Sequence, residues 1–361
     1  MADVIDAAEQ EREALNTGTK PVAETHRFDE AALERWMQAN VAGYAGPLEV
    51  RQFKGGQSNP TYQLITPNKK YVLRRKPPGK LLPSAHAVDR EYKVITAVGT
   101  TGFPVAKTYG LCVDDGVIGT WFYIMDMVEG RILWDQTLPQ YEPPERHAIF
   151  MDKIKTLAEL HNTDYEAIGL SDFGRPGNYM GRQVERWTKQ YKLAETEPIP
   201  AMDRLIEWLP QNIPAGDETA IVHGDYRLDN MIFHPTEPKI LAVLDWELST
   251  LGHPMADFSY HCMSWHIAPG QFRGIGGLDL KALNIPDEAE YIAMYAKNTA
   301  KPVDTSHWRF YMAYNMFRIA AILQGIAKRV EAGTASSEQA VASGRGARPM
   351  AEMAWTFAQK A

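Results

Sequence analysis

The stretch from Ile221 to Asp257 limits the possible folds of this chain more than any other part of the sequence. It carries three polar residues, Asp225, Asn230 and Asp245, and each stands at the end of a short apolar run. Turn-forming residues separate these runs, so we interpret them as short β-strands joined by turns. Strand ends are rigid positions from which a protein can aim carboxylate and amide oxygens at a metal ion and a substrate.

The spacing of these three residues is typical of phosphoryl-transfer sites. Mg²⁺ prefers oxygen ligands and takes one or two of them from the protein, while phosphates and water supply the rest. Asn230 and Asp245 meet that requirement, and Asp225, five positions before Asn230, is placed to orient a hydroxyl nucleophile. Protein kinases separate a catalytic Asp and an Asn by the same interval and add a later metal-binding Asp. We therefore predict a catalytic Asp225 and a magnesium pair, Asn230 and Asp245, although each residue alone would more often cap a turn.

Composition narrows the class of protein. The chain has 361 residues, of which 45% are hydrophobic and 23% charged, as expected for a globular protein with two domains or lobes. Its formal net charge of −7 argues against a broad nucleic-acid-binding surface. No apolar run approaches the roughly 20 residues of a membrane span. The two cysteines, Cys112 and Cys262, do not make a disulfide framework, and the polar N-terminus lacks a signal-peptide core. We predict a cytoplasmic protein that binds neither nucleic acid nor a membrane; no residue pattern indicates the oligomeric state.

The first part of the chain reads as a flexible arm, residues 1–25, followed by a small lobe rich in strands, residues 26–129. Asp29 has the chemistry of a helix N-cap ahead of an amphipathic helix. Two predicted strands, 48–53 and 62–66, then flank a glycine-rich loop. Backbone N–H groups of such a loop can cover phosphates, although Gly-Gly is also common in ordinary hairpins. The residues of this candidate loop are Gly55, Gly56, Gln57, Ser58 and Asn59.

A third predicted strand, 71–76, carries the cations of the small lobe. Side chains alternate along a strand, so Arg74 and Lys76 share one face, which we place opposite the glycine-rich loop. Kinases use a Lys at this place to hold phosphates and pair it with a Glu on the next helix. Arg74 stands at that place here, and Glu91 lies on the next predicted helix, 86–98. The pattern leaves open whether Arg74 or Lys76 holds the phosphates, and a solvated basic edge strand is the alternative.

Two further strands, 105–113 and 119–127, flank Asp114-Asp115-Gly116, which is a hairpin signal. The second strand leads into the segment 126–130, after which the sequence becomes helical. We interpret this segment as the hinge between two lobes, of a kind that binds adenine through backbone groups. The small lobe thus has five predicted strands and one crossing helix.

Residues 130–361 are predicted to form a larger, mainly helical lobe for catalysis and substrate binding. Arg182 and Arg186 stand four apart on one helix face there. They either meet an anionic substrate or pair with carboxylates such as Glu185 and Asp203.

Three histidines, His253, His261 and His266, lie close together in the sequence around Asp257. A zinc site is the alternative to consider here, but the spacing matches no standard zinc-ligand signature. We interpret Asp257 instead as an acceptor that holds the metal-binding loop.

Taken together, the motifs of this chain resemble the aminoglycoside phosphotransferase family, which is related to choline kinases. In chain order these motifs are GGQSNPTY, YVLRRKPPG, DREY, IMDMVEG, HGDYRLDN and LDWELSTLGHPMAD. The motifs VLRRKPPG, NYMGRQVERWTKQY and FRIAAILQGIAKR are most similar to the kinase-like domain fused to acyl-CoA dehydrogenases and to its free-standing bacterial relatives. The resemblance extends from about Phe28 to the C-terminus.

This resemblance implies an α+β, two-lobe protein-kinase-like fold, with a small antiparallel-sheet N-lobe that binds nucleotide and a mainly helical C-lobe. It implies ATP and Mg²⁺ as cofactors. Asp225 would orient and deprotonate the acceptor hydroxyl, while Asn230 and Asp245 would hold Mg²⁺.

In the small lobe the resemblance implies that Arg74 takes the place of the family's usual phosphate-binding Lys, as in choline-kinase-like members, and pairs with Glu91. Asp126 and Val128 would offer backbone groups to adenine. The glycine-rich loop would cover the phosphates.

The implied reaction moves the γ-phosphate of ATP to a hydroxyl group of a small molecule. The fused relatives are thought to phosphorylate hydroxyacyl-CoA or hydroxy-acid substrates, and Arg182, Arg186 and Arg227 would suit such an anion. Aminoglycosides are polycations and require a strongly acidic cleft, whereas the stretch after Asp257 offers histidines and Trp265.

Other functions remain as alternatives. One is an aminoglycoside, amino-sugar or choline-type kinase. Another is a catalytically silent nucleotide-binding scaffold, against which the intact Asp225, Asn230 and Asp245 argue. A protein kinase is disfavoured because no A-P-E element follows Asp245.

Overall fold

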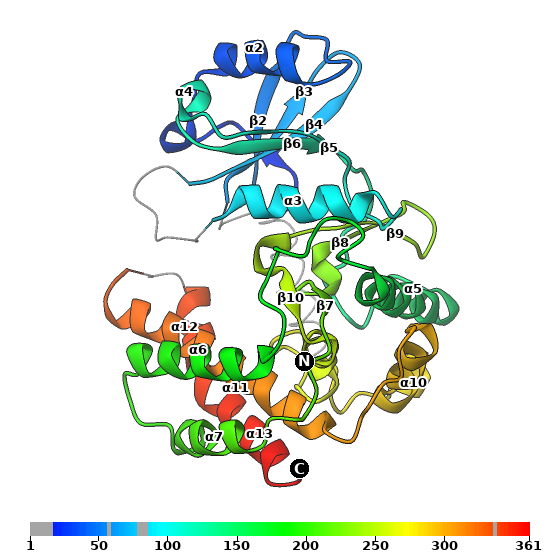
Figure 1. Cartoon of the computed structure of the whole chain (residues 1–361), viewed down its shortest axis with the longest axis vertical. Coiled ribbons are helices and arrows are strands. Elements are labelled where there is room, and N and C mark those ends of the chain that lie inside the picture. Colours follow the sequence, from blue (N-terminus) through cyan, green and yellow to red (C-terminus); the bar gives the residue numbers. More distant parts are fainter. Residues whose placement is uncertain (1–16, 56–58, 78–85, 335–337) are drawn as a thin grey trace. The chain divides into compact units, whose positions relative to one another are not determined.

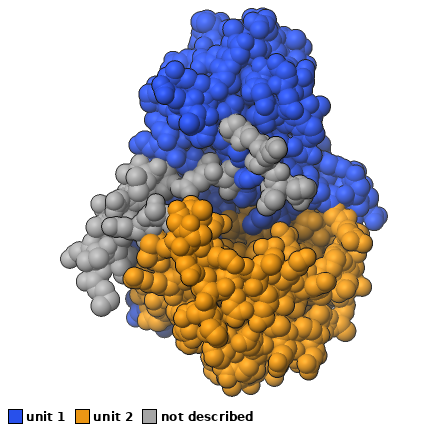
Figure 2. Space-filling model, turned by 90° about the vertical axis from the view of Figure 1, so that its left-hand side faces the viewer, with its two compact units in different colours: residues 1–173, 227–249, 279–286 blue, residues 174–226, 250–278, 287–361 orange. Residues whose placement is uncertain are grey.

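The computed structural model describes residues 17–55, 59–77, 86–334 and 338–361. The chain divides into two compact units, which Figure 2 colours separately. Unit 1 consists of residues 1–173, 227–249 and 279–286, and unit 2 of residues 174–226, 250–278 and 287–361. This division differs from the lobe boundary near Glu129, which stays a prediction.

Unit 1 contains a six-stranded antiparallel sheet with the strand order β1-β2-β3-β4-β6-β5. The strands are β1 (Thr19–Lys20), β2 (Glu49–Phe53), β3 (Thr61–Ile65), β4 (Lys70–Arg75), β5 (Thr108–Cys112) and β6 (Phe122–Asp126). The sequence predicts five of these strands. The sixth, β1, pairs with β2 through Thr19 and Phe53, in a segment that the sequence assigns to the flexible arm.

One face of this sheet packs against helix α2 (Glu30–Asn40). The helix begins where the sequence predicts, because the Asp29 side chain accepts a hydrogen bond of 2.9 Å from the Ala32 amide. Leu33 and Met37 are fully buried against the alternate strand residues that point the same way. These strand residues include Tyr62, Leu64, Tyr71, Leu73, Phe122 and Ile124.

The opposite face of the sheet carries helix α3 (Val88–Gly99), which Figure 1 shows alongside β5 and β6. Arg74 of β4 and Tyr123 of β6 are cross-strand partners, and both reach Glu91 of α3. Since side chains alternate along a strand, the neighbour of Arg74 points the other way: Arg75 donates to the His26 carbonyl at 2.8 Å. Strand alternation therefore decides which arginine faces α3.

The β5–β6 connection confirms the predicted hairpin in its pairing but differs in its turn. A short helix, α4 (Asp115–Ile118), replaces a tight turn. Asp114 caps it by accepting from the Gly116 amide at 2.8 Å, and Gly119 ends it in the left-handed region at a φ of 83°.

After β6, the chain runs close to a second, two-stranded sheet in unit 1, formed by β8 (Met231–Phe233) and β9 (Ile240–Val243). Gly130 makes this approach possible, because a Cβ there would lie 2.2 Å from the Phe233 carbonyl oxygen. The remaining elements of unit 1 are η1 (Glu24–His26), α5 (Pro143–Asn162), η2 (Leu228–Asn230), η3 (Trp246–Leu248) and α9 (Leu280–Leu283).

Unit 2 is mainly helical and is built around α11 (Trp308–Glu331). Its other elements are α6 (Tyr179–Ala194), α7 (Pro200–Gln211), β7 (Ala220–Val222), β10 (Thr250–Gly252), α8 (Pro254–Cys262), η4 (Met263–Trp265), α10 (Glu288–Asn298), α12 (Glu338–Arg345) and α13 (Ala347–Ala358). The polar residues that interrupt the apolar sequence of α11 bond to its neighbours. Asn315 donates to the Ala256 carbonyl at 2.9 Å and Gln324 to the Ala194 carbonyl at 3.1 Å. Among the described helices, none combines the length and the apolar composition that a bilayer span requires.

Candidate functional site

Asn230 and Asp245 lie at the same end of the β8–β9 hairpin. Met231 pairs with Val243 in this antiparallel ladder, so the residue before β8 and the residues after β9 are neighbours. The Leu244 amide donates to the Asn230 carbonyl at 2.8 Å, which extends the pairing by one step. The backbone of Asn230 and that of Asp245, which a Pro-rich turn separates in the sequence, thus lie at one end of the hairpin.

Asp245 is held in an unusual backbone conformation. Its φ of 63° lies in the left-handed region, which Asp tolerates better than most residues. The next residue, Trp246, is 2% exposed, donates its indole N–H to the Val243 carbonyl at 2.9 Å and packs edge-on against Phe103. Trp246 therefore anchors the chain directly after the left-handed residue Asp245.

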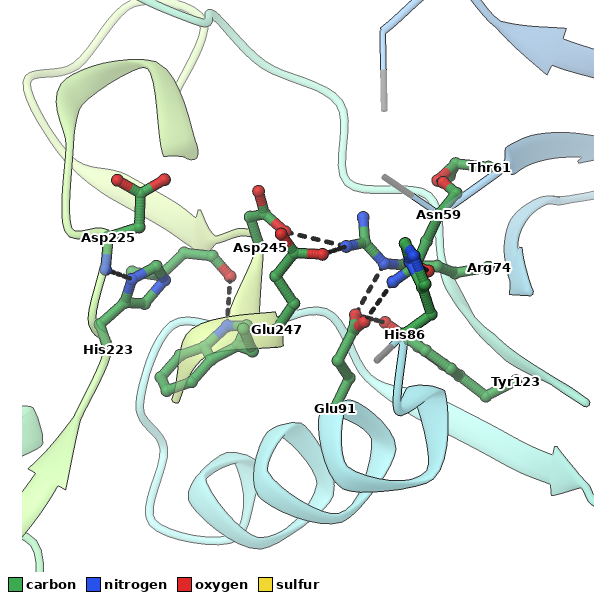
Figure 3. A network of polar contacts seen from close by, with 12 residues as sticks. Asn59, Thr61, Arg74, His86, Glu91, Tyr123, His223, Asp225, Asp245 and Glu247 are labelled. Atoms are coloured by element: carbon green, nitrogen blue, oxygen red, sulfur yellow. Dashed lines mark hydrogen bonds and ion pairs between the residues drawn. The ribbon is translucent and has the colours of Figure 1, made fainter. Parts of the chain in front are cut away.

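The carboxylate of Asp245 meets the guanidinium group of Arg74 (Figure 3). Nη2 of Arg74 lies 2.8 Å from Oδ1 of Asp245, and Nε lies 2.7 Å from Oε2 of Glu91. Glu247, two residues after Asp245, approaches the same guanidinium at 3.7 Å. The pairing of Arg74 with Glu91 that the sequence predicts is therefore present, and it extends to two further carboxylates.

This cluster is largely buried: the side chains of Arg74 and Glu91 are 12% and 2% exposed. Burial lowers the pKa of Arg74, but Glu91, Tyr123, Asp245 and Glu247 outweigh that effect and raise it above its ordinary value. Burial raises the pKa of Glu91, against the opposing charge of Arg74. The close guanidinium–carboxylate contacts lead us to treat Arg74 and Glu91 as an ion pair.

Lys76, the other candidate cation, points elsewhere. Its Nζ lies 3.8 Å from the centre of the Trp121 ring and 3.8 Å from a carboxylate oxygen of Asp89. Of the two cations, Arg74 is the one that pairs with Glu91.

The glycine-rich loop is described only at its ends. Gly56, Gln57 and Ser58 lie outside the described residues, and Gly55 is half-buried after β2.

Asn59 is fully buried and belongs to the Glu91 network. Its side-chain amide donates to Oε1 of Glu91 at 2.7 Å, and its oxygen lies 2.9 Å from Nδ1 of His86. Since this oxygen accepts, Nδ1 of His86 is the donor. Asn59 thus ties the end of the loop to Glu91, and its contact with nucleotide stays a prediction.

At the predicted hinge, the Asp126 amide donates to the Lys107 carbonyl at 2.8 Å. The carboxylate of Asp126 accepts from the Tyr109 hydroxyl at 2.7 Å and pairs with Lys69 at 2.8 Å. Asp126 is also paired with Tyr71 of β4, as the last residue of β6. Val128 is half-buried just beyond β6.

Asp225 belongs to unit 2, where it follows β7 and is half-buried. The preceding loop is held by Asp257 of α8, whose carboxylate accepts from the His223 amide at 2.7 Å and from the Gly224 amide at 2.8 Å. The Asp225 amide in turn donates to Nδ1 of His223 at 3.2 Å (Figure 3). Asp257 is thus the acceptor that the sequence predicts, acting on the segment before Asp225.

The three arginines predicted to meet an anionic acceptor have different surroundings. Arg182 donates to the carbonyls of Gly177 and Arg175. Arg227, in unit 1, lies 3.6 Å from a carboxylate oxygen of Asp229. The two hydrogen bonds of Arg182 stabilise the loop before α6.

Arg186 is exposed and lies over the Trp187 ring at 5.5 Å. Ion pairs with Glu185 or Asp203 were one of the two alternatives that the sequence left open, and Arg186 forms neither in the described part of the chain. Asp203 pairs with Lys192 at 2.9 Å.

The histidines near Asp257 bond to separate partners in unit 2. His253 lies 3.0 Å from Glu218, His261 lies 2.7 Å from the Tyr291 hydroxyl, and His266 lies 2.7 Å from Glu288. Within the described ranges, no group of three or more His, Cys, Asp or Glu residues is arranged to hold a metal ion.

Several residues around the site were not predicted. Glu247 stands two positions after Asp245, so the LDWE motif itself was the available signal. Tyr123 donates to Glu91 at 3.2 Å, and Tyr260 donates to Oδ1 of Asp225 at 2.6 Å. Neither tyrosine is identifiable from sequence spacing, because each reaches its partner through tertiary packing.

Comparisons with known proteins place this geometry in context. A family model described as Phosphotransferase enzyme family matches residues 49–292. Acyl-CoA dehydrogenase family member 10 of Mus musculus is 47% identical over 347 residues, which cover 95% of this chain and 32% of that protein. Family member 11 of Gallus gallus is 43% identical over 348 residues, which cover 94% and 44%. The chain spans less than half the length of these relatives.

Among solved structures, a Ralstonia eutropha protein provisionally described as an aminoglycoside phosphotransferase is 62% identical, with a TM-score of 0.87, over 92% of this chain and 99% of that one. A variant aminoglycoside phosphotransferase in complex with ADP and hygromycin B is 13% identical, with a TM-score of 0.58, over 91% and 98%. At that identity the likeness concerns the fold alone. The predicted α+β, two-lobe kinase-like fold class is confirmed.

Proposed function

The chain belongs to the phosphotransferase enzyme family, and on this basis we propose that it transfers the γ-phosphate of ATP to a hydroxyl group of a small molecule. The solved structures that it resembles include aminoglycoside phosphotransferases and a choline kinase. The observation that carries this proposal is the cluster in unit 1 of Arg74, Glu91 and Asp245, with Asn230 at the same hairpin end as Asp245. It joins a buried cation for phosphate to oxygen donors for a metal ion. Phosphoryl transfer depends mainly on such positioning and charge neutralisation.

Mg²⁺ and nucleotide are proposed from the chemistry of these donors. Asn230 and Asp245 are hard oxygen donors at one hairpin end, which suits Mg²⁺ better than a metal that prefers nitrogen or sulfur. When bound, Mg²⁺ would neutralise phosphate charge. Arg74 would hold the phosphates from the small lobe, and the Asp126 carbonyl and Val128 amide would contact adenine.

We assign Asp225 the role of orienting the acceptor hydroxyl and accepting its proton. The short covalent connection from Asp225 to Asn230 supports this assignment, as does the fixed conformation of the loop that carries it. A carboxylate in this role contributes typically about 10²–10⁴-fold to the rate.

For the acceptor we propose a hydroxy acid or a hydroxyacyl-CoA. The relatives named acyl-CoA dehydrogenase family members support an acyl-type acceptor. Arg186, exposed and without an ion-pair partner in the described part of the chain, would suit an anion. Of the other two predicted arginines, Arg182 is engaged by backbone carbonyls and Arg227 lies near Asp229.

Two alternatives remain. An amino-sugar or choline-type kinase would accept a cation, and relatives by fold include such enzymes. A silent nucleotide-binding scaffold would retain the fold without turnover, but the paired Arg74 and Glu91 and the intact Asp225 favour an active enzyme.

The decisive experiment measures Mg²⁺-dependent ADP release over a panel of hydroxy acids, hydroxyacyl-CoAs, choline and amino sugars, with Asp225→Asn as the control. We expect turnover of an anionic acceptor and its loss in the variant, with ATP binding retained. Turnover of an amino sugar alone would reject the acceptor class, and ATP binding without any turnover would favour the scaffold.

We also propose that the protein works in the cytoplasm. Cys112 and Cys262 are buried thiols that form no disulfide, which suits a reducing compartment.

A further inference from the structure

The loop that carries Asp225 is held from several sides within unit 2. Gly224 has a left-handed φ of 82°, and its amide donates to Asp257, as does the His223 amide. The Gly224 carbonyl accepts from Nη2 of Arg318 at 2.8 Å. The peptide groups before Asp225 thus bond to α8 on one side and to α11 on the other.

The carboxylate of Asp225 has its own partner on α8. The Tyr260 hydroxyl donates to Oδ1 of Asp225 at 2.6 Å, and Tyr260 is 6% exposed. A donor at this distance restrains rotation of the carboxylate about its last side-chain bond. At this distance the bond is a strong one, because a carboxylate accepts it.

Arg318 links the two sets of contacts. Its guanidinium lies 5.1 Å from the centre of the Tyr260 ring and 5.6 Å from that of Trp187. Within the described part of the chain it forms no ion pair, and its Nε is buried without a hydrogen-bond partner. Arg318 is half-buried, and its described contacts are the Gly224 carbonyl and the two aromatic rings.

The charge of Arg318 is retained. Burial lowers the pKa of this guanidinium, but Tyr314, Tyr260, Tyr179 and Asp225 raise it, and the net direction is upward. Arg318 is therefore a cation, and its guanidinium lies over the Tyr260 ring.

We propose that Tyr260 and Arg318 are positioning residues for Asp225: Tyr260 fixes its carboxylate directly, and Arg318 fixes the preceding peptide and the Tyr260 ring. This inference rests on the proposed function, since it assumes that Asp225 acts on the acceptor. Neither residue needs to touch the substrate. Both would act through the orientation of Asp225, and their removal would lower kcat more than it changes the KM for ATP.

The test uses the full chain and its basal Mg²⁺-ATPase activity, with water as the acceptor, so that no substrate must be known. Tyr260→Phe keeps the ring over which Arg318 lies and removes only the hydroxyl. We expect about a tenfold loss of kcat with the KM for ATP unchanged, the size of one hydrogen bond to a charged group. Arg318→Met should lose a similar factor, and Arg318→Lys, which keeps a charge and a donor but not the planar group over the rings, should recover part of it.

A matched control comes from the same unit. Tyr291→Phe removes a buried hydroxyl that lies 2.7 Å from His261, so it should cost comparable stability without a change in kcat. If Tyr260→Phe and Tyr291→Phe lower kcat equally, the effect is one of general stability and the proposal is wrong.

A double-mutant cycle separates this proposal from the proposed function. In the Asp225→Asn background, Tyr260→Phe should change kcat by less than about twofold, because its effect passes through the missing carboxylate. Equal ATPase activity in wild type and Asp225→Asn would reject the role of Asp225 itself. A large loss in Asp225→Asn with none in Tyr260→Phe would reject only the positioning role.

Discussion

The Arg74 cluster of unit 1 and the Asp225 loop of unit 2 hold their polar groups in different ways. Arg74, Glu91 and Asp245 meet through side-chain charges that are buried, and Arg74 and Asp245 are 171 positions apart in the sequence. The Asp225 loop is held through backbone groups, with Asp257 accepting from two consecutive amides. The first arrangement buries charged side chains, whereas the second fixes the conformation of a loop.

The difference has an energetic consequence. Removing one partner of a buried ion pair leaves a charge without compensation, which costs far more than the pair itself stabilises. Removing one hydrogen bond to the Asp225 loop costs the free energy of that bond and leaves the Asp225 side chain less firmly oriented. Variants in unit 1 should therefore act mainly on stability and nucleotide binding, and variants in unit 2 mainly on turnover.

The largest expected effect is that of Asp225→Asn. The amide keeps the size of the side chain but cannot accept a proton, so kcat for ADP release should fall by about 10³-fold or more. Calorimetric titration with ATP should give an unchanged affinity. A weaker affinity for ATP with an unchanged kcat would show that Asp225 contributes to nucleotide binding and not to the acceptor step.

Glu91→Gln should have the next largest effect. It replaces the closest of the three carboxylates around Arg74 by a neutral amide, while Asp245 and Glu247 remain, so the free energy of unfolding should fall by about 1–3 kcal/mol in urea titrations. ATP affinity should fall as well. The double variant Arg74→Met/Glu91→Gln should lose less than the sum of the single losses, and strict additivity would show that the two residues do not interact.

Asp257→Asn tests the loop of unit 2. One amide oxygen cannot replace two carboxylate oxygens, so we expect a stability loss of about 1–3 kcal/mol and a lower kcat at constant ATP affinity. The matched control is Asp152→Asn in unit 1, which weakens a 2.7 Å bond from the Ile240 amide to a carboxylate. It should cost stability alone, and an equal loss of kcat there would remove the distinction between the units.

The smallest expected effect is that of Lys76→Met, which is compared with Arg74→Met to separate the two candidate cations. Arg74→Met should weaken ATP binding by about 10–100-fold, because it removes a buried, bidentate-capable cation. Lys76→Met should weaken ATP binding by less than about threefold. Lys76 lies over the Trp121 ring, and its partner Asp89 has a side chain that is 40% exposed. The reverse order in titration calorimetry would assign the phosphates to Lys76.

Much of the fold could be predicted from local pattern. The helix cap at Asp29 and the strands around the glycine-rich loop follow from consecutive residues, and all are present. The β5–β6 turn was predicted less well, because Asp-Gly signals a reversal without specifying that a helical turn makes it. Strand β1 was missed because a two-residue pairing leaves no periodicity to detect.

Some candidate site residues were predicted with their partners and others were not, because tertiary packing decides where a side chain points. Arg74 and Glu91 were paired from motif order, and the structure places them 2.7 Å apart. Asn59 was predicted as a nucleotide contact, yet its side chain bonds to Glu91, since only packing decides which way a loop residue turns. Tyr260 and Arg318 carry no motif signal at all.

The sequence by itself determined the family and the order of the polar residues at strand ends, because spacing along the chain and strand alternation are properties of consecutive residues. The tertiary structure decided which groups meet. That Arg74 rather than Lys76 pairs with Glu91, that Asp245 joins them, and that Tyr260 reaches Asp225 all depend on strand register and helix packing between distant segments. Polar groups inside a packed interior are almost always hydrogen-bonded, and the partner of each group depends on which distant segments pack together. A local sequence pattern does not contain that information.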